Sequence, residues 1–344
     1  MTTKRTFALA AILGFVAVAL GGFLLWQGQR GDDIPGVTYQ TRAIDPGPML
    51  HLADVLASDA LEGRGSGTPG ADAARGFIRK RFEDTGLKPY LQSGWEHPVT
   101  ILPRPGLDAP VPGANLIGWV AGETPGLGPL IIVTAHYDHL GIRDGEIYNG
   151  ADDNASGAAA LTAIAEYFVR QPPRHDILFV ALDGEEVGFL GARALVRDPA
   201  LPLDRAALNI NMDMISRSDV DELYVAGTFH TPGLAAFVEG VASEAPVQLR
   251  IGHDRPEDGI NDWTTQSDHA LFHELGVPFL YFGVEDHPDY HKPTDDFSAI
   301  PLDFYVRSAD TVALAVRAAD AALPEIFALR RAQTAPDQPE GPAE

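Results

Sequence analysis

Continuous apolar runs that alternate with helical segments constrain the fold of this chain most strongly. The runs cover residues 129–135, 177–182 and 278–284, and a clear helical pattern covers 155–171. A strand with one face in water would alternate apolar and polar residues, so these strands are expected to be buried on both faces. This order predicts an α/β fold with three layers, α/β/α, around a mostly parallel mixed central sheet.

One domain is expected from residue 45 to residue 332. Residues 68–86 have apolar positions at helical spacing, and Gly86 is the expected stop. The glycine-rich stretch 62–70 lacks the Lys-Ser/Thr ending of a phosphate-binding loop, and no strand precedes it, so we interpret it as a flexible loop. Residues 333–344 are rich in Pro and Glu and are predicted to be a disordered tail.

The N-terminal region predicts a membrane anchor. Residues 6–26 carry no charge, and about 20 apolar residues span a bilayer as a helix. No good cleavage site follows, which favours an uncleaved transmembrane signal-anchor over a cleaved signal peptide. The basic residues before the span keep residues 1–5 in the cytoplasm. We therefore expect a linker at 27–44 and a membrane-anchored domain on the periplasmic or extracellular face; the alternative is secretion after signal cleavage.

Charge and cysteine content exclude several classes of function. The formal net charge is −23, and such a surface repels nucleic-acid backbone and anionic membrane, so no nucleic-acid partner is expected. Contact with the membrane is expected only through the N-terminal helix. The chain has no cysteine, which excludes a Cys nucleophile, disulfides, thiolate zinc sites and iron–sulfur clusters.

Residue types that bind metals follow the predicted strands at their carboxyl ends, where ligand sites lie in open α/β sheets. The candidates are His136, Asp138, His139, Asp152, Asp153, Asn154, Glu185, Glu186, Asp213, His287, Tyr290 and His291. Nitrogen and oxygen ligands without sulfur suit zinc, manganese or cobalt. Two ions about 3.5–4 Å apart would need a shared carboxylate and two further ligands each.

Each of these segments also has a simpler interpretation. Asp and Asn are favoured helix caps, acidic residues suit the start of a helix, and the loop 287–297 could be plain surface. However, a helix cap needs one such residue, whereas residues 152–154 provide three. Asp213 lies in an otherwise apolar strand, where a buried Asp needs a partner. The adjacent Glu185 and Glu186 repel each other unless a cation lies between them.

Five segments resemble one enzyme family in both sequence and order. They are "TAHYDHLG", "NGADDNASG", "ALDGEEVGFLG", "NMDMIS" and "YHKPTDD". They resemble the co-catalytic di-zinc exopeptidases, which include bacterial leucyl-type aminopeptidases, glutamate carboxypeptidase and glutaminyl cyclases. The resemblance covers residues 50 to 325. It implies two Zn²⁺ ions, for which Co²⁺ or Mn²⁺ can substitute, and peptide substrates.

Carried over residue by residue, the resemblance also implies the metal ligands. The implied ligands are His136, Asp152, Glu186, Asp213 and His291. Asp152, the first of the Asp pair, would bridge both metals. His136 and Asp213 would complete one metal site, and Glu186 and His291 the other. His287 is the competing histidine in the last loop, and the Tyr-His context and Asp295, four residues on, favour His291.

The resemblance implies three further roles. Glu185 would bind no metal and act as general base on a metal-bound water. Asp138 would orient His136, and Tyr290 would donate a hydrogen bond to the oxyanion. The most expected activity is that of a zinc-dependent aminopeptidase, which removes N-terminal residues from peptides.

Several alternatives stay open at this stage. A carboxypeptidase or dipeptidase would use the same metal site. Single-zinc glutaminyl cyclases keep fewer metals, so the complete ligand set disfavours them. A non-catalytic membrane-anchored binding ectodomain would be expected to lose metal ligands. Arg217 and Asp268 are guesses for the group that recognises the free terminus of the substrate.

Overall fold

Nine strands form one mixed sheet in the computed structural model, which describes residues 34–104 and 106–334. The strand order is β1-β3-β7-β4-β8-β11-β9-β10, and β2 also pairs with β3. The central strands β7, β4, β8 and β11 run parallel to one another. The pairings of β3 with β7 and of β11 with β9 are antiparallel. The predicted three-layer fold with a mixed central sheet is therefore confirmed, and the four central strands form its parallel part.

The elements have the following bounds in chain order: α2 (Pro46–Leu56), η2 (Asp59–Arg64), α3 (Pro69–Thr85), β1 (Lys88–Pro89), β2 (Glu96–Ile101), β3 (Val111–Val120), β4 (Leu130–His136), β5 (Gly141–Arg143), β6 (Glu146–Tyr148), η3 (Ala151–Ser156), α4 (Gly157–Arg170), β7 (Asp176–Leu182), α5 (Leu190–Arg197), η4 (Leu203–Arg205), β8 (Ala206–Met212), β9 (Glu222–Ala226), η5 (Pro232–Leu234), α6 (Ala235–Glu244), β10 (Gln248–Ile251), η6 (Pro256–Asn261), η7 (Trp263–Thr265), α7 (His269–Glu274), β11 (Phe279–Gly283), η8 (Phe297–Ala299), α8 (Leu302–Ala321) and α9 (Leu323–Thr334).

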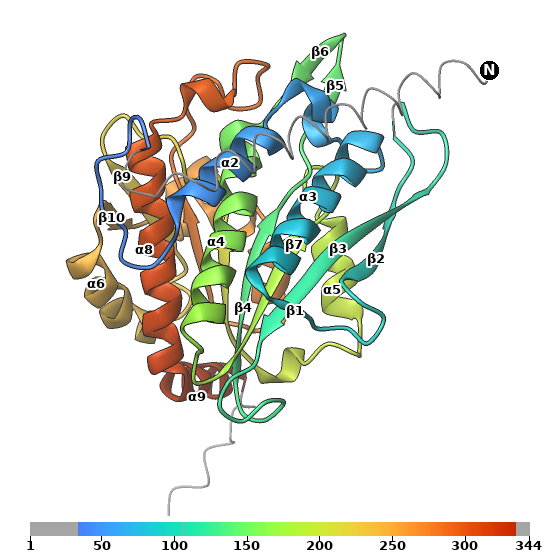
Figure 1. Ribbon diagram of the computed structural model, residues 1–344. Coiled ribbons are helices and arrows are strands. Elements are labelled where there is room, and N and C mark those ends of the chain that lie inside the picture. The colour runs from blue at the N-terminus through green and yellow to red at the C-terminus, as the bar shows by residue number, and fades with distance from the viewer. Residues whose placement is uncertain (1–33, 105, 335–344) are drawn as a thin grey trace, which may run out of the picture.

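Helices cover both faces of the sheet, as the apolar runs predict. Helices α2, α3, α4 and α8 lie over one face, and α5 lies behind the sheet (Figure 1). Within β4, Ile131 and Val133 belong to the core under α4, whereas Leu130 and Ile132 belong to the core under α5 and α7. Alternate residues of one strand thus pack into the two cores on opposite faces of the sheet. This explains why every residue of β4 is buried.

One segment differs from the prediction made for it. The stretch 62–70 is packed rather than a flexible loop, because η2 ends in Arg64, whose side chain is fully buried. Its guanidinium donates to the carbonyl oxygens of Leu56, Tyr137, Asn149 and Gly150. A long helix, α8, fills residues 302–321, and a separate helix, α9, follows it from residue 323.

The predicted anchor at 6–26, residues 27–33 of the predicted linker and residues 335–344 of the predicted tail lie outside the described residues. Within 34–334, no helix combines the length and hydropathy needed to cross a bilayer. Residues 38–44 run along α8, where Asp310 accepts hydrogen bonds from the backbone N–H groups of Arg42, Ala43 and Ile44.

Candidate metal centre

The candidate site lies at the carboxyl ends of the four parallel central strands. His136 is the last residue of β4, and Asp213 directly follows β8. Glu186 lies in the turn after β7, and His291 in the loop after β11. Because these strands are neighbours and point the same way, four segments far apart in sequence meet at one edge of the sheet.

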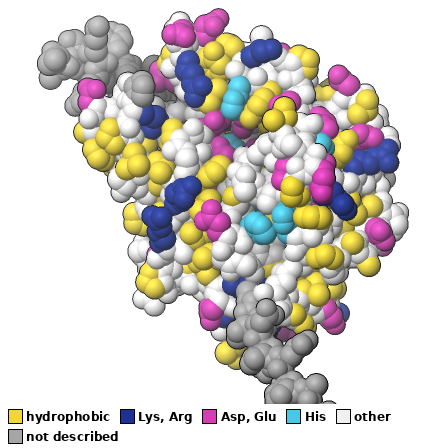
Figure 2. Space-filling view, turned by 180° about the vertical axis from the view of Figure 1, so that it is seen from behind, with side chains coloured by type: hydrophobic (Ala, Val, Ile, Leu, Met, Phe, Trp, Pro, Cys, Tyr) yellow, Lys and Arg dark blue, Asp and Glu magenta, His cyan; other side chains and the backbone are white. Residues whose placement is uncertain are grey.

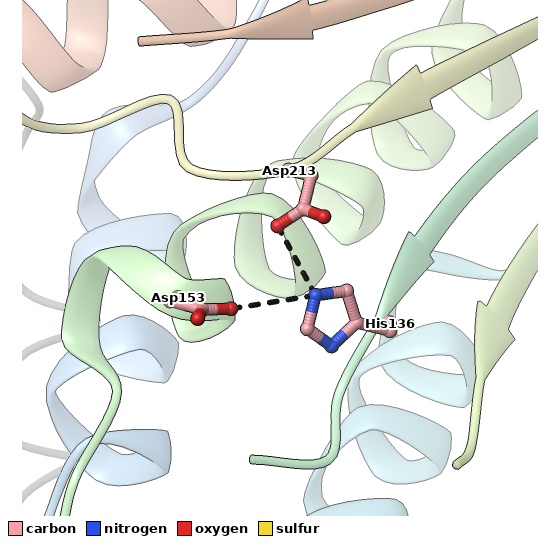
Figure 3. A group of neighbouring side chains, drawn as sticks. All are labelled: His136, Asp153 and Asp213. Carbon is pink, nitrogen blue, oxygen red and sulfur yellow. Dashed lines mark hydrogen bonds and ion pairs between the residues drawn. The ribbon is translucent and has the colours of Figure 1, made fainter. Parts of the chain in front are cut away.

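The first donor group consists of His136, Asp153 and Asp213, and all three are buried. The Nε2 atom of His136 lies 3.1 Å from Oδ1 of Asp213 and 3.5 Å from Oδ1 of Asp153. Figure 3 shows both carboxylates turned toward this nitrogen. The other ring nitrogen of His136, Nδ1, lies 3.1 Å from the backbone carbonyl of Asp138. That contact leaves Nε2 to face the carboxylates.

The second donor group consists of His139, Asp153 and Glu186, with His291 beside it. The Oε1 atom of Glu186 lies 2.8 Å from Nδ1 of His139 and 3.7 Å from Nε2 of His291. The same histidine nitrogens lie 3.6 Å and 3.1 Å from Oδ2 of Asp153. Asp153 therefore turns one oxygen toward each donor group.

Asp153, and not Asp152, occupies the position between the two donor groups, which corrects the bridging position assigned to Asp152. The carboxylate of Asp152 turns away, and its Oδ1 accepts hydrogen bonds from the backbone N–H and the hydroxyl of Ser216 at 2.7 and 2.6 Å. Its Oδ2 lies 3.2 Å from Nε2 of His287. Since consecutive side chains diverge, one member of the pair faces the donor groups and the other faces Ser216. His287 contacts Asp152 and lies outside both groups.

Glu185 and Glu186 take different directions from adjacent backbone positions. Glu186 belongs to the second donor group, whereas the charges that act most strongly on Glu185 are those of His136 and Asp213. The carboxylate of Asp138 accepts the backbone N–H groups of Glu185 and Glu186 at 3.0 and 3.4 Å. Asp138 therefore contacts His136 through its carbonyl group and holds the glutamate turn through its carboxylate.

Two supporting residues were given no role in the site by the sequence analysis, although Asp295 lies in the segment "YHKPTDD". Asp295 accepts the backbone N–H groups of Asp152 and Asp153, each at 3.1 Å, and so fixes the turn that carries the shared carboxylate. Arg64 binds the carbonyls of Asn149 and Gly150, just before that turn. Both residues act across long sequence separations, which local patterns do not reveal.

The carboxylates of the site are crowded and desolvated. Burial raises the pKa of Glu186 to about 7. Burial also raises the pKa of Asp153, and the charge of Glu186 adds to the increase. Burial raises the pKa of Glu185 well above its ordinary value. Acidic groups that repel each other in a buried place are stabilised by a cation between them.

The donor set fits metal ions by its own chemistry. The ring nitrogens of His139 and the Oε1 atom of Glu186 are buried without a hydrogen-bond partner among residues 34–334. Unpaired buried donors and acceptors are costly. Imidazole nitrogens and carboxylate oxygens are the ligands that zinc accepts in catalytic sites. Metal ligation would satisfy Nδ1 of His139 and Oε1 of Glu186 together.

A cleft of about 280 Å³ opens onto both donor groups. Apolar side chains form part of its wall: Phe189, Met214, Trp263, Tyr281 and Val284. Glu185, Asp286 and Tyr290 also line the cleft, and the ring of Tyr290 stacks on His291 with centroids 4.0 Å apart. In Figure 2, acidic and histidine side chains gather around a hollow on the upper part of the face.

The two candidates for the terminus-binding group lie outside the cleft. Arg217 binds Asp289, with Nη1 2.7 Å from Oδ2, and lines a different cavity. Asp268 is fully buried. Neither side chain lines the cleft that opens onto the donor groups.

Comparisons with known proteins agree with this architecture. A family model described as Peptidase family M28 matches residues 115–316. Aminopeptidase YwaD of Bacillus subtilis is 30% identical over 214 residues, which cover 59% of this chain and 44% of the Bacillus protein. The probable glutamate carboxypeptidase VP8 of Zea mays is 28% identical over 341 residues, covering 83% of this chain and 46% of the maize protein. The chain thus spans less than half the length of these two relatives.

Solved structures share the fold. A zinc aminopeptidase from Bacillus subtilis superposes with a TM-score of 0.61 at 18% identity, over 81% of this chain and 96% of the other. A glutaminyl cyclase from Porphyromonas gingivalis superposes with a TM-score of 0.63 at 18% identity, over 80% of this chain and 98% of the other. The family model covers more than half of the 344 residues. The chain therefore belongs to Peptidase family M28, which confirms the resemblance to the di-zinc exopeptidases.

Proposed function

We propose that this protein is a zinc-dependent aminopeptidase that removes N-terminal residues from peptides. The observation that carries the proposal is the position of Asp153, which turns one carboxylate oxygen toward each of two donor groups. A shared carboxylate is what a pair of ions 3.5–4 Å apart requires. Zinc appears in the names of relatives and of fold neighbours, including the zinc aminopeptidase from Bacillus subtilis.

Two ions would be held by residues that the site brings together. His136 and Asp213 would hold one, Glu186 and His291 the other, and Asp153 both. When bound, such ions supply Lewis acidity, which polarises a carbonyl group and makes water a stronger acid. The two complete donor groups disfavour a single-zinc cyclase and a binding module that has lost its ligands.

Glu185 would be the general base. It lines the cleft beside the first donor group but is not a member of either group. It would take a proton from the attacking water and return it to the leaving amine. Tyr290, on the same cleft wall, would donate its hydroxyl proton in a hydrogen bond to the oxyanion that forms from the scissile carbonyl.

The charge of the cleft favours a free amino terminus over a free carboxylate. Its lining includes Glu185 and Asp286 but, within residues 34–334, no Lys or Arg. A protonated α-amine is attracted to such a pocket, whereas a terminal carboxylate has no cation there to pair with. The apolar wall that includes Phe189 and Trp263 suits an apolar first side chain. Carboxypeptidase activity is the second candidate, because one relative is a probable glutamate carboxypeptidase.

Peptides with free and blocked ends test the proposal. The full-length protein, purified in mild detergent and supplied with zinc, is incubated with a set of peptides, and products are read by mass spectrometry. Stepwise loss from free N-termini that acetylation prevents is the expected result. Loss from C-termini would replace the proposal with the carboxypeptidase. Absence of cleavage with zinc, cobalt and manganese would contradict both.

We further propose that residues 6–26 anchor the enzyme in a membrane, with its catalytic domain outside the cytoplasm. The charge-free segment and the basic residues that precede it support this. Retention in the membrane fraction after carbonate washing, with the domain accessible to protease from outside, is the expected result. Release of an N-terminally shortened protein would instead support signal cleavage.

A further inference from the structure

We propose that His139 is an additional protein ligand of the ion held by Glu186 and His291, so that this ion binds two imidazoles and its neighbour only one. The inference rests on the proposed metal-dependent function. The Nδ1 atom of His139 lies 2.8 Å from Oε1 of Glu186 and 3.6 Å from Oδ2 of Asp153. No other role in the site is assigned to this side chain.

The contact between His139 and Glu186 has the geometry of two ligands rather than of a hydrogen bond. The two atoms are close, yet within the described residues neither has a hydrogen-bond partner. Donors that ligate one tetrahedral ion at 2.0–2.1 Å lie about 3.3–3.4 Å apart. The separations among His139, Glu186, Asp153 and His291 are 2.8, 3.1, 3.6 and 3.7 Å, which bracket this value.

The fold holds the imidazole of His139 in place without giving it a polar partner. The side chain is fully buried, and its backbone N–H donates to the carbonyl of Arg64 at 3.3 Å. A Cβ atom on Gly150 would lie 2.4 Å from Cδ2 of the ring, so the close approach of this loop requires glycine. Arg64 in turn binds the carbonyl of Gly150. The ring is thus enclosed from two sides and opens toward Glu186.

A purely structural histidine would look different. The buried His269 has a partner for one ring nitrogen, since its Nε2 lies 2.9 Å from the carbonyl oxygen of Trp263, whereas neither ring nitrogen of His139 has a hydrogen-bond partner among the described residues. Burying a polar nitrogen without such a partner costs free energy, and an apolar ring would fill the same space without that cost. A metal ion on Nδ1 removes the part of this penalty that belongs to Nδ1. An additional nitrogen ligand also predicts that the two ions differ in affinity, with the ion beside His139 held more tightly.

Zinc affinity of the full-length protein tests the inference. Metal-free wild type, His139→Gln and the matched control His269→Gln are titrated with zinc against a chromophoric chelator. We expect wild type and control to bind two ions and His139→Gln to bind one of them at least about 100-fold more weakly. His139→Gln that binds both ions with wild-type affinity would overturn the inference.

X-ray absorption spectroscopy of the zinc-loaded wild type keeps the inference testable if His139→Gln does not fold. Scattering from imidazole rings should correspond to three histidines shared by two ions; two histidines would overturn it. The outcomes also separate the inference from the proposed function. A wild type that binds no pair of ions contradicts both, whereas a wild type with two ions and an unaffected His139→Gln contradicts the role of His139 alone.

Discussion

Neighbouring acidic residues of this site point in different directions. Asp153 faces both donor groups, whereas Asp152 faces Ser216. Asp153→Asn should remove the shared carboxylate and lower the affinity for both ions by at least about 100-fold. Asp152→Asn keeps an oxygen for Ser216, so it should retain both ions. Metal analysis after gel filtration measures the difference. Full zinc content in Asp153→Asn, or its loss only in Asp152→Asn, would restore Asp152 as the bridging residue.

Glu185 and its neighbour Glu186 are also expected to have different roles. Glu185→Gln leaves the donor groups intact and removes the proton acceptor, so kcat should fall by about 10²–10⁴-fold while bound zinc stays at the wild-type level. Glu186→Gln is the control, because it should lose metal as well as rate. Parallel kinetics and metal analysis decide between them. Near wild-type turnover of Glu185→Gln would show that another group is the base.

The sequence predicts which segments form the site better than it predicts which atom of each segment points into it. His136, Glu186, Asp213 and His291 lie where strand ends were expected to bring them together. The choice within "DD" was wrong because the direction of each side chain depends on the turn that Asp295 and Arg64 hold from far along the chain. His139 was among the candidate residues, but the resemblance gave it no ligand role, and the role proposed for it depends on contacts that only the fold shows.

Among the secondary-structure elements, the buried strands and the ends of the helices could be predicted from the sequence. The helix expected at 68–86 is α3, and Gly86 caps it in the left-handed conformation at φ 85°. The edge strand β2 was missed, since Pro98 lies inside an alternating segment and argues against a strand. β2 tolerates this proline because it pairs on one side only, with β3.

The attachment of residues 38–44 to α8 is a property of the fold that a single substitution tests. Asp310 accepts three backbone N–H groups and the hydroxyl of Tyr39. Asp310→Ala should lower the free energy of unfolding by about 3 kcal/mol, because buried donors lose a charged acceptor. Tyr39→Phe removes one of these bonds and should cost about 1 kcal/mol. Urea denaturation measures both; equal small losses would mean that the segment contributes little to stability.

For the whole molecule, a buried histidine predicts how stability depends on pH. Burial lowers the pKa of His269 to about 3, whereas in the unfolded chain it titrates near 6.5. Below pH 6.5 the unfolded state binds a proton that the folded state does not, so this residue makes the protein less stable as pH falls from 6.5 toward 3. The contribution is about 1.4 kcal/mol per pH unit, and it vanishes above pH 6.5.

Comparison of wild type with His269→Gln isolates this contribution. The free energy of unfolding of both proteins is measured in urea at pH 7 and pH 5 with a chelator present. From pH 7 to pH 5, wild type should lose about 2 kcal/mol more of this free energy than the variant. The variant lacks the group that must be charged on unfolding, so it loses less stability in acid. An identical pH dependence for both proteins would mean that His269 is protonated in the folded state.

The central claim for the molecule is that two metal ions at the ends of β4, β7, β8 and β11 are required for peptide hydrolysis. The most direct measurement follows bound zinc and release of N-terminal residues in the same samples, as metal-free enzyme is titrated with zinc. We expect no hydrolysis without zinc and full rate with two bound ions. Full rate in the metal-free protein, or none with two ions bound, would contradict the claim.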